Sequence, residues 1–407
     1  MQLTLNTHYT LIAAVVVLMV GRLLVSRVSL LSHFNIPEPV AGGLVAALLV
    51  AVLHRVEGFS LTIDGALQDT FMLMFFASIG LNADFSRLRA GGMPLVVLTA
   101  AVSAFIVVQN LIGLGMASML GLHPLTGLIA GSVTLTGGHG TAGGWGPMLE
   151  EMGVQGATAI GMACATFGLI LGGLTGGPVA QRLINRHGCR TPGRASLEDS
   201  SGDIAFEQPR HTRLITADSA LETITMFAIA LAAAQLLTGI LADLLAHTTI
   251  RVPTFVLALG SGIVVRNILS RIFNVEVFDR CVDVIGNVSL SLFLAMAMLS
   301  LKLWQLVDLA IPLLLILFVQ TVVMVLYVSL VTFRFLGKDY DAAVIAAGHC
   351  GFGMGATPTA VANMQAVTQR YGISHKAFLI VPLVGAFFVD IINTLALSIF
   401  TALPFLH

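Results

Sequence analysis

The sequence predicts an all-α polytopic membrane protein with ten transmembrane helices in two inverted five-helix repeats, each carrying one re-entrant hairpin. Three observations predict this class: the composition, a series of apolar runs, and a likeness between the two halves of the chain. Hydrophobic residues make up 57% of the 407 residues, charged residues make up 10%, and the mean hydropathy is +0.94. Because a soluble domain carries about 25% charged residues, this composition excludes a soluble enzyme. The net charge of −1 also gives no basic surface for a nucleic acid.

The apolar runs give the expected spans, at about 20 residues per crossing. They lie at 9–25, 37–54, 69–84, 94–119, 157–184, 218–246, 252–269, 282–300, 309–334 and 375–404. The first run follows a stretch without basic residues and ends at Arg22 without a small-residue cleavage site, so we expect a retained span rather than a signal peptide. The polar segment 186–213, with its Pro, Gly and Ser residues, is typical of a flexible linker.

The two halves on either side of this linker resemble each other in three places. VVQN at 107–110 matches FVQT at 318–321, and NIPEPVAGG at 35–43 matches RVPTFVLAL at 251–259. GLIAGSVTLTGGHGTA at 127–142 matches AVIAAGHCGFGMGATPTA at 343–360. We therefore expect a first repeat at 1–185 and a second at 214–407, joined by the linker 186–213. Five spans per half place the second copy upside down, which is an architecture typical of secondary transporters.

The positive-inside rule gives the orientation of these spans. With the N-terminus outside, only Arg55, Arg251 and Lys302 of the 20 Lys and Arg residues fall in outer loops, and the other 17 fall on the cytoplasmic side. This asymmetry predicts that both termini are periplasmic and that the linker is cytoplasmic.

Two glycine-rich segments, at about 125–145 and 342–360, are the predicted hairpins. The first has seven Gly in 21 residues, too many for a continuous lipid-exposed helix. Non-helical backbone at membrane depth must be buried in protein or line a cavity. We expect Gly138 and Gly353 at the tips of two opposed hairpins, where free N–H groups can bind an anion. The alternative is that these glycines serve only tight helix packing, the role that we assign to the GxxxG-spaced Gly168, Gly172 and Gly176.

The candidate substrate contacts are the polar and glycine residues of both hairpins and a glutamine in each fourth span. His139 and His349 either couple protons or donate one hydrogen bond while neutral, and we favour the second role. The buried amides of Gln109 and Gln320 either contact substrate or join helices. The full set is Thr134, Thr136, Gly137, Gly138, His139, Gly140, Thr141, Gly351, Gly353, Gly355, Thr357, Thr359, Gln109 and Gln320.

The candidate sodium ligands centre on Asp390, the one acid deep inside an apolar run. Asn393 follows three residues later on the same helical face, and Asn363 and Asn287 are further amides inside the repeats. Carboxylate and amide oxygens suit a hard cation, although Asp390 can instead bind a substrate ammonium or form a structural hydrogen bond to a hairpin. We expect no transition-metal site and no cofactor, with Na⁺ as the only metal ion.

Four segments resemble the bacterial glutamate:sodium symporter family: IPEPVAGG (36–43), TGGHGTAGGW (136–145), GNVSLSLFLAMA (286–297) and GHCGFGMGATPTAVANMQA (348–366). The resemblance covers nearly the whole chain. It implies a homodimeric, Na⁺-driven importer of L-glutamate in the inner membrane, with a transport domain that moves past a dimerising scaffold. Since no Arg or Lys is expected deep in any span, the backbone N–H groups of the hairpins are the expected binding site for the carboxylates.

Three other classes remain as alternatives. One is a different inverted-repeat carrier, for another small organic anion coupled to sodium or protons. A channel does not need two deep hairpins that close a central site. An intramembrane enzyme would have to use His139 or His349 with Cys350, for which the sequence shows no orienting partner.

Overall fold

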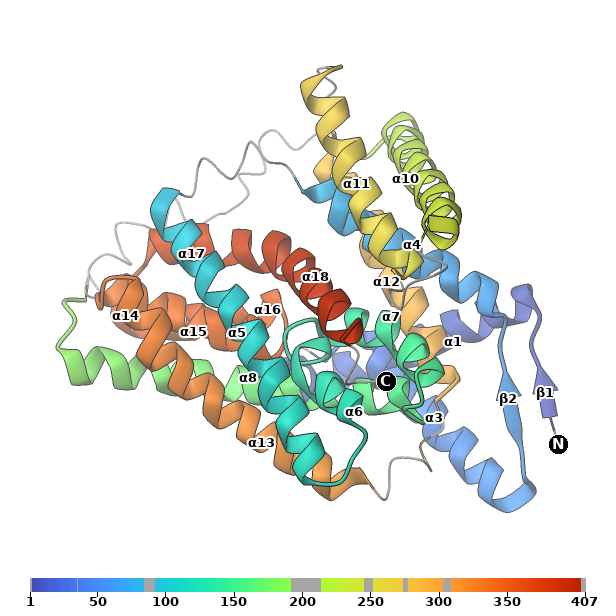
Figure 1. Ribbon diagram of the computed structural model, residues 1–407, viewed down its shortest axis with the longest axis horizontal. Coiled ribbons are helices and arrows are strands. Elements are labelled where there is room, and N and C mark those ends of the chain that lie inside the picture. The colour runs from blue at the N-terminus through green and yellow to red at the C-terminus, as the bar shows by residue number, and fades with distance from the viewer. Residues whose placement is uncertain are drawn as a thin grey trace.

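Helices account for nearly all of the chain that the structure, a computed structural model, describes (Figure 1). The described residues are 2–34, 36–83, 92–191, 214–244, 252–273, 277–301, 303 and 309–403. The predicted linker 186–213 lies outside these ranges from residue 192 onwards. The chain is therefore an all-α polytopic membrane protein in its described part, as predicted, apart from one small pair of strands.

Nine of the ten apolar runs coincide with a described helix that is long and apolar enough to cross a membrane. These nine helices are α1 (Thr7–Arg27), α3 (Glu38–Glu57), α5 (Gly92–Met119), α8 (Ala157–His187), α10 (Ala217–Leu244), α11 (Thr254–Arg271), α12 (Asp279–Leu299), Ala310–Phe335 and His375–Thr401. The last two each contain a π-helical turn. Ala310–Phe335 divides into α13 (Ala310–Tyr327), η6 (Val328–Thr332) and α14 (Phe333–Phe335). His375–Thr401 divides into α17 (His375–Leu383), η7 (Val384–Phe388) and α18 (Val389–Thr401).

The third run, 69–84, corresponds to α4 (Gly65–Asn82), which is less apolar than the other nine helices. Gln68, Asp69 and Asn82 lie within its 18 residues and lower its hydropathy. At about 1.5 Å per residue, a helix of this length reaches roughly 27 Å, close to the thickness of the hydrocarbon core.

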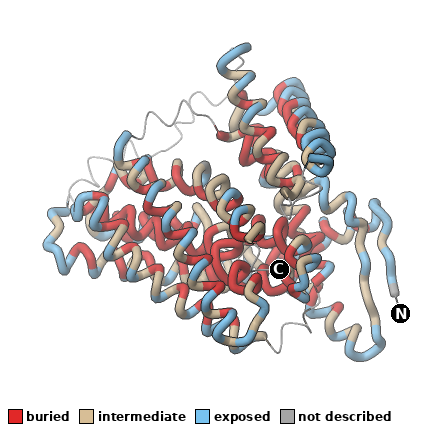
Figure 2. The backbone as a smooth tube through the Cα atoms, viewed as in Figure 1, coloured by how far each residue is buried: buried red, intermediate tan, exposed pale blue. Residues whose placement is uncertain are grey.

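Both predicted hairpins consist of two helices joined by a non-helical break. The first comprises α6 (Pro124–Leu128), the π-helical turn η2 (Ile129–Val133) and α7 (Gly138–Glu151). The second comprises α15 (Tyr340–Met354) and α16 (Thr357–Tyr371), and extends well beyond the predicted end at 360. We call them the first and the second broken segment. Figure 2 shows that their backbone is mostly buried, which removes the free polar groups at each break from lipid.

The sequence analysis missed the short elements at the edge of the molecule. Strand β1 (Gln2–Thr4) pairs in parallel with β2 (Ser60–Thr62), and α2 (Ser29–His33) follows α1. The Thr7 hydroxyl donates to the carboxylate of Asp64, which caps the N-terminus of α4. This contact lowers the pKa of the exposed Asp64 carboxyl, because a hydrogen-bonded carboxylate resists protonation.

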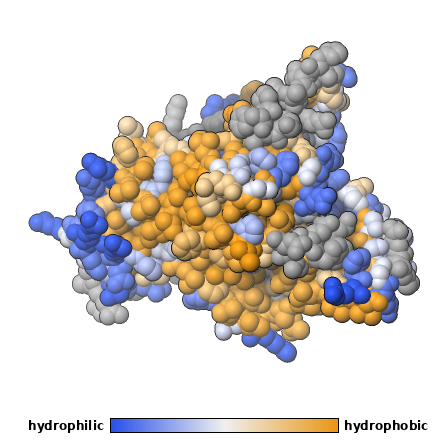
Figure 3. Space-filling model, turned by 60° about the horizontal axis from the view of Figure 1, so that its bottom comes forward, coloured by the Kyte–Doolittle hydropathy of each residue, from blue (hydrophilic) through white to orange (hydrophobic). Residues whose placement is uncertain are grey.

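Burial separates outer helices from inner ones. Only 22% of the apolar window of α1 and of α10 is buried, against 56% for α8 and α12. Large apolar side chains such as Met19 and Leu236 stay 67% and 69% exposed, and apolar atoms cover much of the surface in Figure 3. Such a surface requires lipid or another protein as its surroundings.

The helices form two groups that are visible side by side in Figure 1. The α4 group contains α1, α3, α4, α10, α11 and α12. The hairpin group contains α5 to α8 and α13 to α18. Contacts are dense inside each group and sparse between them, where α7 and α8 reach α12 and η7 reaches α4. Each group takes the same elements from both halves of the chain: the first three spans in the α4 group, and the last two spans with the broken segment in the hairpin group.

The glycine series of α8 packs against the second broken segment, which confirms the close contact predicted for it. A Cβ at Gly168 would lie 2.3 Å from the carbonyl oxygen of Met354, and one at Gly176 would lie 2.3 Å from Asn363 Nδ2. These glycines let the backbone of α8 approach that of α15 directly.

We expect Gly168→Val to destabilise the protein strongly and Gly177→Val on the same helix to leave it nearly unchanged. A Cβ at Gly177 would meet nothing within 4 Å, so the pair differs in packing but not in helix propensity. Overpacking typically costs about 1–3 kcal/mol, and here the obstacle is backbone, which cannot rotate away. Thermal unfolding of the two purified variants in one detergent checks this; equal melting temperatures would contradict it.

Candidate functional site

The helix of the first broken segment is interrupted near Ser132 and resumes at Gly138. Gly131 has non-helical dihedrals (φ −103°, ψ −131°), and Gly138 has φ +65°, which favours glycine. The amide of Ser132 donates to Asn110 Oδ1 (3.1 Å), and its carbonyl accepts from Asn393 Nδ2 (2.9 Å). Side chains from α5 and α18 therefore satisfy the backbone groups that the break frees.

The two broken segments meet through the glutamine of α5. Gln109 Nε2 donates to the carbonyl oxygen of Gly353 at 2.8 Å, and Thr136 Oγ1 donates to Gln109 Oε1 at 2.5 Å. Gln320 Nε2 on α13 donates to the Gln109 carbonyl oxygen at 2.8 Å. The equivalent glutamines of the two halves thus lie at one junction, and these amides join helices, as one of the two predicted roles requires.

The glycines at this junction have different tasks. A Cβ at Gly138 would lie 3.3 Å from the Gly355 carbonyl oxygen, so the two breaks adjoin. Gly353, expected at a tip, instead lies inside α15, and the second break falls at Gly355, with φ −153° and ψ −95°. The expectation for Gly353 is wrong because α15 stays helical up to Met354.

Several polar atoms at the junction are buried and have no hydrogen-bond partner among the described residues. Around the first break these are Asn110 Nδ2, Ser132 Oγ and Asn393 Oδ1, all on side chains with 0% exposure. Gln320 Oε1 and Thr359 Oγ1 are also buried and have no hydrogen-bond partner among the described residues. An unpaired buried polar group costs about 1–3 kcal/mol, so these atoms are candidates for contact with a ligand.

The two histidines differ in their surroundings. His139, the second residue of α7, donates from Nε2 to Thr166 Oγ1 (3.0 Å), because the Thr166 hydroxyl hydrogen already points to the Met162 carbonyl oxygen (2.9 Å). His349, in the second predicted hairpin, lies inside helix α15, where Nδ1 is 2.9 Å from Thr332 Oγ1 and the ring stacks on Phe352. The glycines on either side of His349 are helical.

Asp390 lies in the first turn of α18, directly after the π-helical turn η7. Its side chain is half-buried and makes no hydrogen bond or ion pair with the residues that the structure describes. Asn393, three residues on, brings its unpaired Oδ1 to the first break. Asn393 therefore stands at the junction, and Asp390 precedes it by three residues on α18.

Other predicted residues have packing roles in the structure. Asn363 Nδ2 donates to the carbonyl oxygens of Gly172 (2.8 Å) and Ala347 (3.3 Å) and so joins α16 to α8 and α15. The Thr134 hydroxyl donates a hydrogen bond to the Ile129 carbonyl oxygen (2.6 Å). Asn287 is exposed on α12, in the other helix group, and the structure does not bring it to the junction.

The remaining predicted residues surround the breaks or fill close contacts. Gly137 and Thr141 are neighbours next to Asn393, and Thr357 lies against Gly385 of η7. Gly351 faces the backbone of Ala360. Gly140 belongs to a different contact, since a Cβ there would lie 2.6 Å from the ring of Phe75 on α4.

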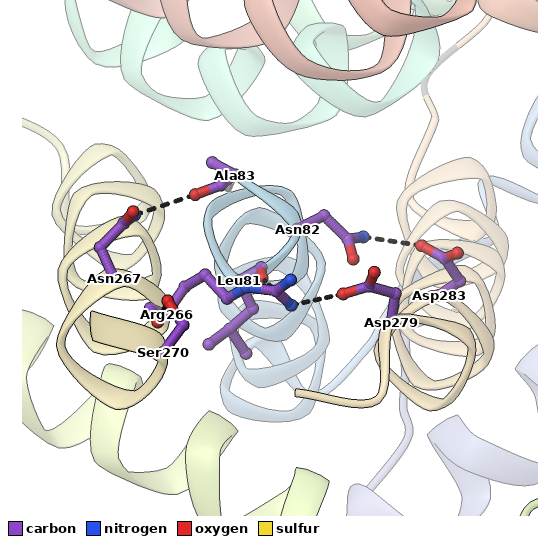
Figure 4. Close-up of polar contacts among 8 residues, drawn as sticks. All are labelled: Leu81, Asn82, Ala83, Arg266, Asn267, Ser270, Asp279 and Asp283. Atoms are coloured by element: carbon purple, nitrogen blue, oxygen red, sulfur yellow. Dashed lines mark hydrogen bonds and ion pairs between the residues drawn. The ribbon is translucent and has the colours of Figure 1, made fainter. Parts of the chain in front are cut away.

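The sequence analysis missed a buried cation at the end of α4, drawn in Figure 4. Arg266 of α11 is 4% exposed, forms an ion pair with Asp279 of α12 and lies 3.5 Å from the Leu81 carbonyl oxygen. Nearby, Asn82 donates to Asp283 (2.7 Å). Arg266 lies in the last turns of α11, not deep in the span, and a carboxylate and the negative end of helix α4 neutralise its guanidinium.

Comparisons with known proteins agree on one family. A family model described as sodium/glutamate symporter matches residues 3–373. The chain is 53% identical over 401 residues to the sodium/glutamate symporter of Escherichia coli (strain K12), covering 98% of each chain. It is 50% identical over 403 residues to that of Haemophilus influenzae, again covering 98% of each chain.

Proposed function

This chain belongs to the sodium/glutamate symporter family, and from that premise we propose that it imports L-glutamate together with Na⁺ across the bacterial inner membrane. The near full-length likeness to named symporters is the observation that carries this proposal. The chain is accordingly a multi-pass transporter and not an enzyme. The alternative, a carrier for another small organic anion on the same fold, shares every helix but differs in the substrate that the site accepts.

We place both ligands at the junction of the two broken segments. The N-termini of α7 and α16 beside the breaks and the unpaired amide nitrogen of Asn110 suit the two carboxylates of glutamate. The unpaired oxygens of Ser132, Asn393 and Gln320, with the carboxylate of Asp390, suit Na⁺, which prefers oxygen ligands. We therefore keep Asp390 and Asn393 as the proposed sodium ligands. Asn363 joins helices, and Asn287 is exposed on the other helix group, so we leave both out of the sodium site.

We further propose ten spans in two inverted repeats, 1–185 and 214–407, with re-entrant broken segments. Two observations support this layout. α4 adds a tenth helix to the nine that are apolar enough to span. Each helix group also takes the same elements from both halves, as a duplicated and inverted chain would arrange them.

The two helix groups support an elevator-like form of alternating access. The hairpin group, which contains the proposed site, would move as one body past the α4 group, and the α4 group would join two protomers in a homodimer. The contact between the groups is suited to sliding, because Gly140, Gly143 and Gly144 of α7 present a flat face to the rings of Phe75, Phe293 and Phe76. A flat glycine face lacks the interlocking side chains that would resist a shift.

The orientation is also a proposal: both termini are periplasmic and the linker is cytoplasmic. In a Cys189→Ser background, we expect Arg190→Cys to resist a membrane-impermeant maleimide added to intact cells, and Glu57→Cys to react. Both positions are exposed, whereas Cys164, Cys281 and Cys350 are buried. Labelling of Arg190→Cys alone would reverse the orientation.

Proteoliposomes test the function itself. We expect uptake of labelled L-glutamate under an inward Na⁺ gradient and none when K⁺ replaces Na⁺. Unlabelled amino acids and small organic anions added in excess identify the preferred substrate. Uptake driven by a proton gradient alone, or stronger inhibition by another anion than by glutamate, would favour the alternative carrier.

A further inference from the structure

A cavity of about 360 Å³ lies between the C-terminal end of α8 and the end of the penultimate span, away from the junction. One wall comes from Arg182, Leu183 and Arg186 of α8. The other comes from the last turns of α13, from η6 and α14, and from Lys338 just beyond. Its volume lies within the roughly 300–1,000 Å³ typical of ligand pockets.

The charged side chains that line this cavity are all basic. Arg182, Arg186, Arg334 and Lys338 line it, no carboxylate does, and none of the four forms an ion pair with a described residue. Asp339 follows Lys338 in sequence, but its Oδ1 accepts from the amide of Ala342 at 2.7 Å as the cap of α15. The cavity therefore keeps several positive charges without internal compensation.

The turn that carries Lys338 is held in an unusual conformation. Lys338 has φ +54°, the positive value found for only this non-glycine residue in the described part of the chain. Its amide donates to the Phe333 carbonyl oxygen (3.1 Å), and its own carbonyl oxygen accepts from Cys189 Sγ (3.7 Å). Such a conformation persists only where neighbours enforce it, so the backbone that carries Lys338 is held at the edge of the cavity.

Part of the second wall is apolar, and this part continues onto the outer surface. Leu326 and Leu330 line the cavity and are 52% and 64% exposed. A ligand here meets cations at one end and lipid-facing side chains at the other.

From these observations we propose that the cavity binds the headgroup of an anionic phospholipid. The arginines and Lys338 contact the phosphate, and the acyl chains run along Leu326 and Leu330. Basic pockets between spans at the cytoplasmic surface recognise anionic lipids in this way, and arginine suits the phosphate geometry. A free phosphate would use the cations but leave the apolar wall without a partner. Because α8 and α14 belong to different halves of the chain, the lipid would hold their ends together.

Native mass spectrometry of delipidated protein in detergent tests this proposal. The probes are dioleoyl phosphatidylglycerol, the zwitterionic dioleoyl phosphatidylcholine, and inorganic phosphate as a competitor. We expect one tightly bound phosphatidylglycerol per chain, weaker phosphatidylcholine binding and little competition by phosphate. In Arg182→Gln/Arg334→Gln, the dissociation constant for phosphatidylglycerol should rise about 30-fold, at about 1 kcal/mol per basic residue.

Two further variants separate the cavity from general charge. Arg22→Gln/Arg27→Gln removes two exposed arginines from the end of α1 and should keep tight binding. Arg182→Lys/Arg334→Lys should retain most of it and shows that the altered walls still fold. Equal phosphatidylglycerol binding by the glutamine variant and the wild type, or equal affinity for both lipids, would overturn the proposal. Full displacement by phosphate would show a free-anion site instead and overturn the lipid assignment.

Discussion

Asp390→Asn should raise the Na⁺ concentration needed for half-maximal glutamate uptake by about 10- to 100-fold, the range seen when a partner of a metal site is lost. The carboxylate is half-buried in an apolar helix and makes no hydrogen bond or ion pair with the described residues. An acid in that setting costs about 2.5–3.5 kcal/mol unless a cation neutralises it. The unpaired Oδ1 of Asn393 nearby offers a second oxygen to the same ion.

Glutamate affinity at saturating Na⁺ separates the roles that Asp390 can have. If Asp390 binds Na⁺, as we expect, that affinity recovers to the wild-type value in Asp390→Asn. If it binds the substrate ammonium, the affinity stays weak at every Na⁺ concentration. Asp218→Asn, on the exposed first turn of α10, is the matched control and should change neither value. Normal Na⁺ dependence in well-folded Asp390→Asn protein would remove Asp390 from the sodium site.

The spans were predictable because a run of about 20 apolar residues allows few structures other than a membrane helix. The broken segments were predictable for a related reason, since seven Gly in 21 residues cannot form a stable lipid-exposed helix. What the glycines could not tell is where each break falls. Gly138 adopts positive φ at a break, whereas Gly351 and Gly353 are helical and leave room for atoms of neighbouring helices. Both roles require glycine, so the sequence alone does not distinguish them.

The polar network was less predictable, because it depends on which helices touch. Gln109 and Gln320 stood out as buried amides. The bond from Gln320 to Gln109 depends on the packing of α13 against α5, and the bond from Gln109 to Gly353 depends on the approach of α15 to α5. Ser132 gave no signal, since its part comes from the backbone groups that the break frees. The burial of Arg266 could not be predicted, because its partner Asp279 is on the next helix.

Linking the two helix groups should reduce glutamate uptake to the background level if the hairpin group moves as one body. A second cavity, also of about 360 Å³, lies between them, with Met148 of α7 on one side and Thr254 of α11 on the other. In a Cys189→Ser background, Met148→Cys/Thr254→Cys places one thiol on each group. A short bifunctional methanethiosulfonate would then connect the groups, and a reducing agent should restore uptake.

The control pair uses the same helix α7 but stays inside the hairpin group. Glu150 Oε1 accepts from the Thr158 amide at 3.0 Å, and both residues line one neighbouring cavity. Glu150→Cys/Thr158→Cys, treated with the same reagent, should therefore leave uptake near that of its untreated form. A rigid body tolerates internal links, whereas a sliding contact does not. Full uptake by the linked Met148→Cys/Thr254→Cys protein would rule out movement between the groups, and loss in both pairs would place the essential motion within the hairpin group itself.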